Sequence, residues 1–153
     1  TFTFTARHWR YIDGPVRCVS QGMAQQSFQY EQFAAGTGIT MASGWGGAEA
    51  NGGDWNGAWS NGPRSFVVLR PARGLKPATI LILGHYFEGN ARTRVRVNGI
   101  DLGWHDLAKP KRLALPAGTA GDIGVLLTHE APRKPSAGDP REMALFLRQI
   151  TLR

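Results

Sequence analysis

Short runs of alternating apolar and polar residues, separated by turn residues, constrain the fold of this chain more than any other feature. Side chains of a strand point alternately to opposite faces of a sheet, so a two-residue period predicts a strand. We expect strands at residues 1–5, 27–33, 65–70, 78–87, 93–99 and 122–129. The final segment, residues 142–153, also favours a strand, because Leu145, Leu147, Ile150 and Leu152 do not form a helical stripe.

Turn signals stand between these runs at intervals typical of a β-sandwich or barrel. The clearest is Asn98-Gly99, because a type I′ turn needs positive φ at both central residues. We expect a hairpin there, between residues 94–97 and 100–103. No repeat or linker divides the sequence, so we predict one all-β domain over residues 1–153, an antiparallel β-sandwich. We expect its core to contain Phe66, Val68, Leu81, Leu83, Val95, Val97, Val125, Leu127, Leu145 and Leu147.

Several classes of site are missing from the sequence. No apolar run approaches the roughly 20 residues of a membrane helix, so we predict no membrane insertion. A single cysteine excludes an internal disulfide and a thiolate metal cluster. The four histidines show no metal-ligand spacing, and no aspartate-dense loop indicates a calcium site. No nucleophile elbow or phosphate-binding glycine loop is present. We therefore predict no metal, no cofactor and no catalytic residue.

The formal net charge of +7 suggests an acidic partner. Arg92, Arg94 and Arg96 alternate along one predicted strand and share a face. Nucleic-acid-binding surfaces usually add aromatic residues on the same face, and we identify none there. We interpret this stripe as a solvated strand face and predict no nucleic-acid partner.

The segment GWGGAEANGGDWNGAW, residues 44–59, places three of the five tryptophans among many glycines. Trp45 and Trp59 lie beside apolar strands, and we expect them to close one end of the sandwich, with each indole N–H bonded. Trp55 lies between Asp54 and Asn56, with glycines on both sides. An exposed ring stacks on sugar C–H faces while nearby polar groups bind hydroxyls. The candidate ligand-binding residues are Trp55, Asp54, Asn56, Glu49, Trp59 and His85.

Two charged residues in distant glycine- and proline-rich segments suggest an ion pair. Glu49 belongs to the tryptophan segment, and Arg141 lies near Asp139 before the final predicted strand. A guanidinium holds a carboxylate in a bidentate fork, which would fix two loops to each other. We predict a buried or half-buried contact of Glu49 with Arg141, direct or through Asp139.

Three blocks resemble one family. GWGGAEANGGDWNGAWSNG is similar to G-W-x-x-P-E followed by W-S-x-G, with Trp45, Glu49, Trp59, Ser60 and Gly62 matching. RVRVNGIDLGW resembles the hairpin v-x-V-x-V-N-G of such domains, and SAGDPREMALFLRQITL resembles their closing pattern. The family consists of carbohydrate-binding-module-like jelly-roll domains attached to bacterial membrane glycosyltransferases and phosphoglycerol transferases. Ala48 and Ala144 depart from the pattern, and residues 50–56 resemble an insertion.

The resemblance implies a jelly-roll fold, a glycan or envelope-polysaccharide ligand and an extracytoplasmic location, in the periplasm or at the cell surface. It also implies a membrane-anchored glycosyltransferase or another envelope protein as partner. The resulting hypothesis is a non-catalytic carbohydrate-binding module. The alternatives are a structural domain that docks a partner protein and a small carbohydrate-active enzyme that uses Glu49 with Asp54 or Asp139.

Overall fold

The computed structural model describes residues 7–10, 17–20 and 38–153. Its strands are β1 Arg7–Arg10, β2 Arg17–Ser20, β3 Gly38–Ser43, β4 Trp45–Ala50, β5 Asn56–Ser60, β6 Arg64–Arg70, β7 Thr79–Tyr86, β8 Thr93–Val97, β9 Ile100–His105, β10 Lys111–Ala114, β11 Ile123–His129 and β12 Leu145–Leu152. The described part contains no helix that is long and apolar enough to span a membrane.

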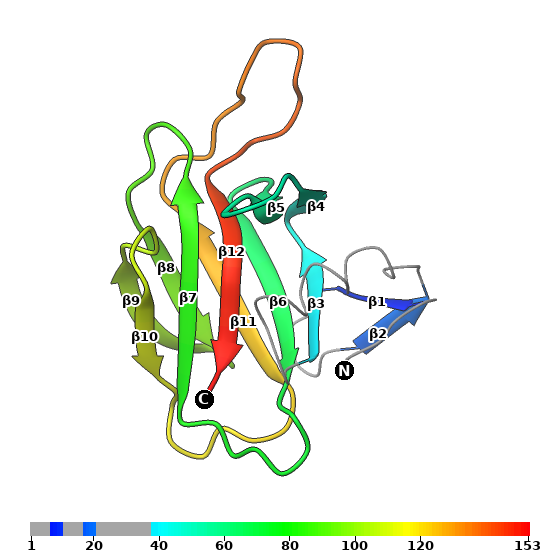
Figure 1. Ribbon diagram of the computed structural model, residues 1–153, viewed down its shortest axis with the longest axis vertical. Helices are drawn as coiled ribbons and strands as arrows, with labels where there is room; N and C mark the ends of the chain where they lie inside the picture. Colours follow the sequence, from blue (N-terminus) through cyan, green and yellow to red (C-terminus); the bar gives the residue numbers. More distant parts are fainter. Residues whose placement is uncertain (1–6, 11–16, 21–37) are drawn as a thin grey trace.

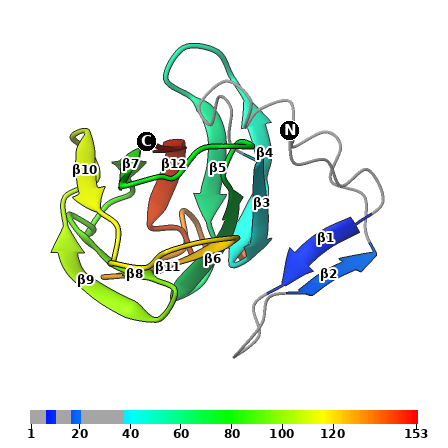
Figure 2. The ribbon, with the colours of Figure 1, turned by 90° about the horizontal axis from the view of Figure 1, so that it is seen from below.

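Two five-stranded antiparallel sheets form the two layers of a sandwich, which confirms the predicted fold class (Figures 1 and 2). Sheet I has the order β10-β7-β12-β5-β4, and sheet II has the order β3-β6-β11-β8-β9. The separate pair β1–β2 lies beside β3 (Figure 2). From β5 onward the chain changes sheet at every connection except the β8–β9 hairpin, as in a jelly roll.

Every predicted strand that falls on described residues is present, as β6, β7, β8, β11 and β12. The predicted strands at residues 1–5 and 27–33 lie outside the described part of the chain. The prediction of one domain over residues 1–153 stays a prediction for the same reason. The β8–β9 hairpin is confirmed, with φ of 49° at Asn98 and 83° at Gly99.

The core lies between the sheets and is built from the inward positions of both. It contains Ile39, Met41, Ala58, Val67, Leu69, Ile80, Ile82, Val95, Val97, Leu107, Leu113, Ile123, Val125, Leu127, Leu145, Leu147, Ile150 and Leu152. Of the predicted core residues, Leu81 is the one that is not buried, because β7 turns Ile80 and Ile82 inward instead. Phe66 and Val68 of β6 are buried. The β6 residues that pack in the cluster between the sheets are Val67 and Leu69 instead.

The tryptophan segment is a strand hairpin rather than the loop that we expected. Residues 45–50 form β4 and residues 56–60 form β5, and Glu49 pairs with Gly57. Glycine has low strand propensity and no side chain, so no two-residue period appears in this segment. The loop of this hairpin spans residues 51–55, and it lies at the same upper end as the long β11–β12 loop (Figure 1).

Candidate functional site

An aromatic row crosses the outer face of sheet I near its upper end. Phe146 of β12 lies opposite His85 of β7 on one side and opposite Trp59 of β5 on the other. Leu145 and Leu147 point into the core, so Phe146 between them points outward. Its ring centroid lies 5.2 Å from that of Trp59, and Phe146 is nevertheless fully buried. Another group must therefore cover it.

Trp55 is that cover. Its ring stacks on His85 with centroids 4.2 Å apart and an interplanar angle of 26°. The centroid of Phe146 lies 5.2 Å from that of Trp55. Trp55 remains 45% exposed. Because His85 covers one face of the indole, the exposed surface includes the opposite face, which is the face that a ligand would contact.

The loop holds Trp55 in place through its own backbone. The Trp55 N–H donates to the carbonyl of Gly52 at 3.1 Å, and the Asn51 N–H donates to the carbonyl of Trp55 at 3.2 Å. The Asn56 Oδ1 accepts from the Gly52 N–H at 3.0 Å. Gly52 and Gly53 have φ of 84° and 57°, a region that residues with a Cβ seldom adopt. These glycines therefore allow a tight loop that presents a fixed ring.

Polar groups border the ring. The Asp54 Oδ1 forms an ion pair with Nη2 of Arg148, which comes from β12. The Asp54 carbonyl lies 3.1 Å from His85 Nε2, and since a carbonyl only accepts, His85 carries a proton on that nitrogen. The predicted ligand residues Trp55, Asp54, Asn56, Trp59 and His85 thus lie together. Phe146 and Arg148 belong to the same cluster and were missed, because strand pairing alone brings them there.

Glu49 takes part in a second polar group at the edge of sheet I. Its Oε2 lies 3.8 Å from Arg141 Nη1, and its Oε1 accepts from Asn51 Nδ2 at 3.2 Å. Arg141 donates more closely to Asp139, with Nη2 2.8 Å from Oδ2. The side chains of Arg141, Glu49 and Asp139 are 39%, 33% and 25% exposed. The structure therefore brings the three ion-pair residues together, and their side chains are half-buried.

The hydrogen bonds from Arg141 hold the pKa of Asp139 below its usual value. A general acid has to carry a proton at the working pH, so Asp139 does not suit that role beside Glu49.

The remaining tryptophans differ in part from expectation. Trp45 packs against the core and its Nε1 donates to the Phe66 carbonyl at 3.0 Å, as expected. Trp59 lies in the outer aromatic row instead of closing the core, because its β5 position faces away from Ala58. Trp104 is 39% exposed on sheet II. The side chain of Trp9 lies outside the described residues.

His129 is buried. It ends β11, and its Nε2 lies 2.8 Å from the Ser65 Oγ. Ser65 donates to the carbonyl of Gly44 at 2.6 Å, so His129 must donate to Ser65. Burial lowers the pKa of His129 to about 4. Because Ser65 and His129 are only 0% and 5% exposed, no substrate reaches them.

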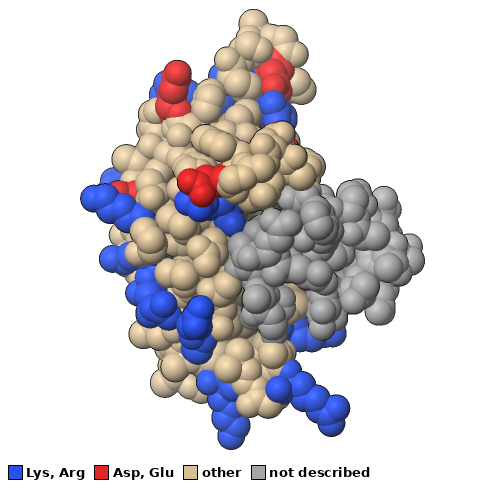
Figure 3. Space-filling model, viewed as in Figure 1, with Lys and Arg blue, Asp and Glu red and all other residues tan. Residues whose placement is uncertain are grey.

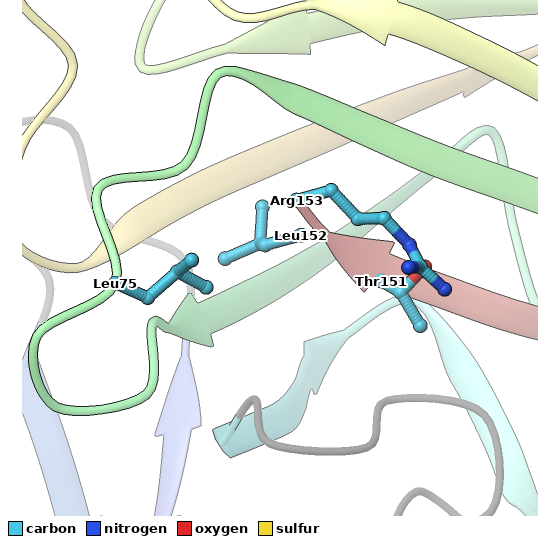
Figure 4. A pocket seen from close by; sticks show the side chains of 4 residues that line it. All are labelled: Leu75, Thr151, Leu152 and Arg153. Atoms are coloured by element: carbon cyan, nitrogen blue, oxygen red, sulfur yellow. The ribbon is translucent and has the colours of Figure 1, made fainter.

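A hollow of about 460 Å³ lies at the opposite end of the sandwich (Figure 4). It is lined by Leu75, Thr151, Leu152 and Arg153. These four residues offer a sugar no aromatic ring, so the Trp55 cluster is the better candidate. In the view of Figure 3, the charged side chains on the lower half of the molecule are mainly Lys and Arg, and the acidic side chains lie on its upper half. Within the described residues, no group of three or more His, Cys, Asp or Glu side chains is arranged to hold a metal.

Comparisons with known proteins add one structural likeness. No protein-family model and no curated protein matches the sequence. The solved structure of a family 35 carbohydrate-binding module from an environmental isolate is similar to this chain, with a TM-score of 0.47 and 17% sequence identity. The match covers 75% of this chain and 91% of that chain. At this level of similarity it says nothing about what this chain binds.

Proposed function

We propose that this protein is a non-catalytic carbohydrate-binding module that stacks a sugar ring on Trp55. The observation that carries the proposal is an exposed indole held by loop hydrogen bonds and backed by His85. An ordered ring loses little conformational entropy on binding, which makes it an effective stacking surface. Asp54, Arg148 and Asn56 border the ring with donors and acceptors suited to hydroxyl groups.

The ligand that we propose is a bacterial glycan, and the sequence resemblance supports an envelope polysaccharide outside the cytoplasm. The same resemblance supports a membrane-anchored glycosyltransferase or another envelope protein as the partner that presents or receives this glycan. Glu49 and Arg141 lie beside the Trp55 loop and connect to it through Asn51. In this proposal they hold the loop and do not catalyse a reaction.

The test is a glycan array followed by calorimetric titration of the oligosaccharides that bind. Trp55→Ala should weaken binding about tenfold or more, which corresponds to ~1.4 kcal/mol. Trp55→Phe should keep part of the affinity because it keeps a stacking ring. Leu75→Ala is the control, since Leu75 is also an exposed apolar residue but lies at the opposite end of the sandwich. It should have no effect on sugar binding.

Three results would contradict the proposal. Absence of binding across the array would remove the sugar ligand, and a stoichiometric protein partner would then favour the docking alternative. Equal affinities of the unmodified protein and Trp55→Ala would place the site elsewhere. Release of products from a polysaccharide by the unmodified protein, lost in Glu49→Gln, would show an enzyme.

A further inference from the structure

The outer face of sheet II carries a second group of functional side chains, which the Trp55 site does not use. Arg94 of β8 lies opposite Trp104 of β9, so both side chains point to the same face. The Arg92 guanidinium lies 5.0 Å from the centroid of the Trp104 ring. The prediction that the face with the three arginines carries no aromatic residue is therefore wrong. The reason is that β8–β9 pairing, rather than sequence proximity, brings Trp104 there.

Two of the three arginines on this face are already neutralised. Arg92 pairs with Glu130 at 2.9 Å. Arg94 pairs with Asp101, and its hydrogen bonds hold the pKa of Asp101 at about 2. Both pairs are well exposed, and in each pair the carboxylate balances the charge of the guanidinium group.

Arg96 differs from its neighbours on the strand. No ion pair of the described residues includes it. Its Nε is buried and has no hydrogen-bond partner within the described part of the chain. Asp101 lies opposite Arg96 in the strand pairing, but its oxygens accept from Arg94 and from the Gly103 N–H. Arg96 is therefore a partly buried cation that forms no close ion pair of its own and shares the charge of the Asp101 carboxylate with Arg94, so a further anion would be stabilised there.

Neighbouring strands fix the position of Arg96. It lies opposite Leu126 of β11, which in turn lies opposite Phe66 of β6. A guanidinium held against apolar neighbours keeps its fork orientation, which suits bidentate binding of a carboxylate or phosphate. Trp104 lies opposite Arg94, which precedes Arg96 by two residues on the same face of β8, and the pairing with β9 shifts register between Arg94 and Arg96. Trp104 and Arg96 thus occupy neighbouring positions on one face of sheet II.

We propose that this face binds a polysaccharide that carries spaced anionic groups, with a sugar ring on Trp104 and its carboxylate or phosphate on Arg96. The charge balance favours such a polymer over a nucleic acid. Three guanidinium groups face two carboxylates, which leaves one net positive charge. A nucleic acid would bring one phosphate per nucleotide against Glu130 and Asp101. It would also need several stacking rings, whereas Trp104 is the exposed aromatic residue on this sheet among those described.

The test measures binding of oligosaccharides that differ only in charge. Uronic acid oligomers are compared with their methyl esters, and a phosphorylated mannan is compared with its dephosphorylated form. The unmodified protein should bind at least one charged form about tenfold more tightly than its uncharged counterpart, and this preference should fall with added salt. A preference for the uronate or for the phosphate identifies the anionic group, and either result supports the proposal.

Variants separate the two groups of this surface. Arg96→Met keeps the apolar stem and should abolish the preference for the charged form, whereas Arg96→Lys should keep part of it. Trp104→Ala should weaken charged and uncharged forms alike. Leu75→Ala, at the far end of the sandwich, is the control and should leave the preference unchanged. The same comparison made in a Trp55→Ala background separates this test from the Trp55 site. Thermal unfolding checks that each variant remains folded.

The proposal is overturned if the unmodified protein binds none of the charged oligosaccharides, or if Arg96→Met keeps the preference. Tighter binding of an oligodeoxythymidylate, with competition against the charged glycan, would assign the surface to nucleic acid instead.

Discussion

Removing the Ser60 hydroxyl should destabilise the fold strongly, because this one oxygen serves two buried backbone groups. Ser60 ends β5 and is fully buried. Its Oγ accepts from the Ala144 N–H at 3.1 Å and from the Leu145 N–H at 2.9 Å. Leu145 begins β12, so this oxygen fixes the start of the strand that carries Phe146.

The expected magnitude follows from the two donors that Ser60→Ala would leave unpaired. A buried polar group without a partner costs about 1–3 kcal/mol, so two such groups cost about 2–6 kcal/mol. The total stability of a domain is about 5–15 kcal/mol, and the loss is therefore a large part of it. For a chain of this length, ~2 kcal/mol lowers the melting temperature by about 4–8 °C.

Urea unfolding followed by tryptophan fluorescence measures this loss. Ser60→Cys fills the space of the hydroxyl with a slightly larger sulfur that is only a weak acceptor, so it should be at least as destabilising as Ser60→Ala. Ser136→Ala, an exposed serine in the β11–β12 loop, should change stability by less than about 0.5 kcal/mol. A loss below ~1 kcal/mol for Ser60→Ala, or a neutral Ser60→Cys, would refute the reasoning.

Two further predictions concern charged groups. His129 has a pKa of about 4 when folded and 6.5 ordinarily, so the unfolded chain takes up its proton first as the pH falls. Stability should decrease by roughly 3 kcal/mol between pH 6.5 and pH 4, and urea unfolding across this range should show a smaller decrease in His129→Gln. Glu49→Gln and Arg141→Met, made singly and together, should show a coupling below about 1 kcal/mol, because both side chains are over 30% exposed and 3.8 Å apart. A double variant clearly more stable than Arg141→Met alone would show that Glu49 is instead a buried, unpaired charge in that variant.

The sequence predicted strands where one face is apolar and failed where the strand is glycine-rich or short. Residues 93–97 alternate clearly, and they correspond to β8. Residues 45–50, by contrast, contain too few apolar side chains for a period to appear. The continuous apolar run of β7 predicts a strand but not its register, which explains why Leu81 was assigned to the core in place of Ile80.

The sequence predicted only those residues of the candidate site that lie next to one another in the chain. Trp55 stands out because its glycine-rich surroundings are unsuited to a core anchor, and Asp54 and Asn56 follow from adjacency. Phe146 and Arg148 lie about ninety positions away, and only the pairing of β12 with β5 and β7 brings them to the site. Trp104 remained unassigned to the arginine face for the same reason. Contacts made across strands need a known register, which a two-residue period does not supply.

The sequence nevertheless predicts one long-range feature of the site. The inward residues of β12 are Leu145 and Leu147 and then Ile150 and Leu152, so the apolar set changes from odd to even positions. A regular strand cannot turn both pairs inward, and the structure shows a register shift between Leu147 and Gln149. The shift leaves Arg148 as the extra residue, and its side chain reaches Asp54 beside Trp55.

The same irregularity explains a glycine on the partner strand. A Cβ on Gly57 would lie 2.0 Å from the Leu147 carbonyl oxygen, a separation that no side chain tolerates, so β5 can approach the shifted part of β12 only with glycine there. Gly52 and Gly53 serve the loop that presents the ring, whereas Gly57 serves the strand beneath it. The glycine content of the tryptophan segment therefore has two causes. One is the conformation that exposes Trp55, and the other is the close packing that brings Arg148 to the edge of the site.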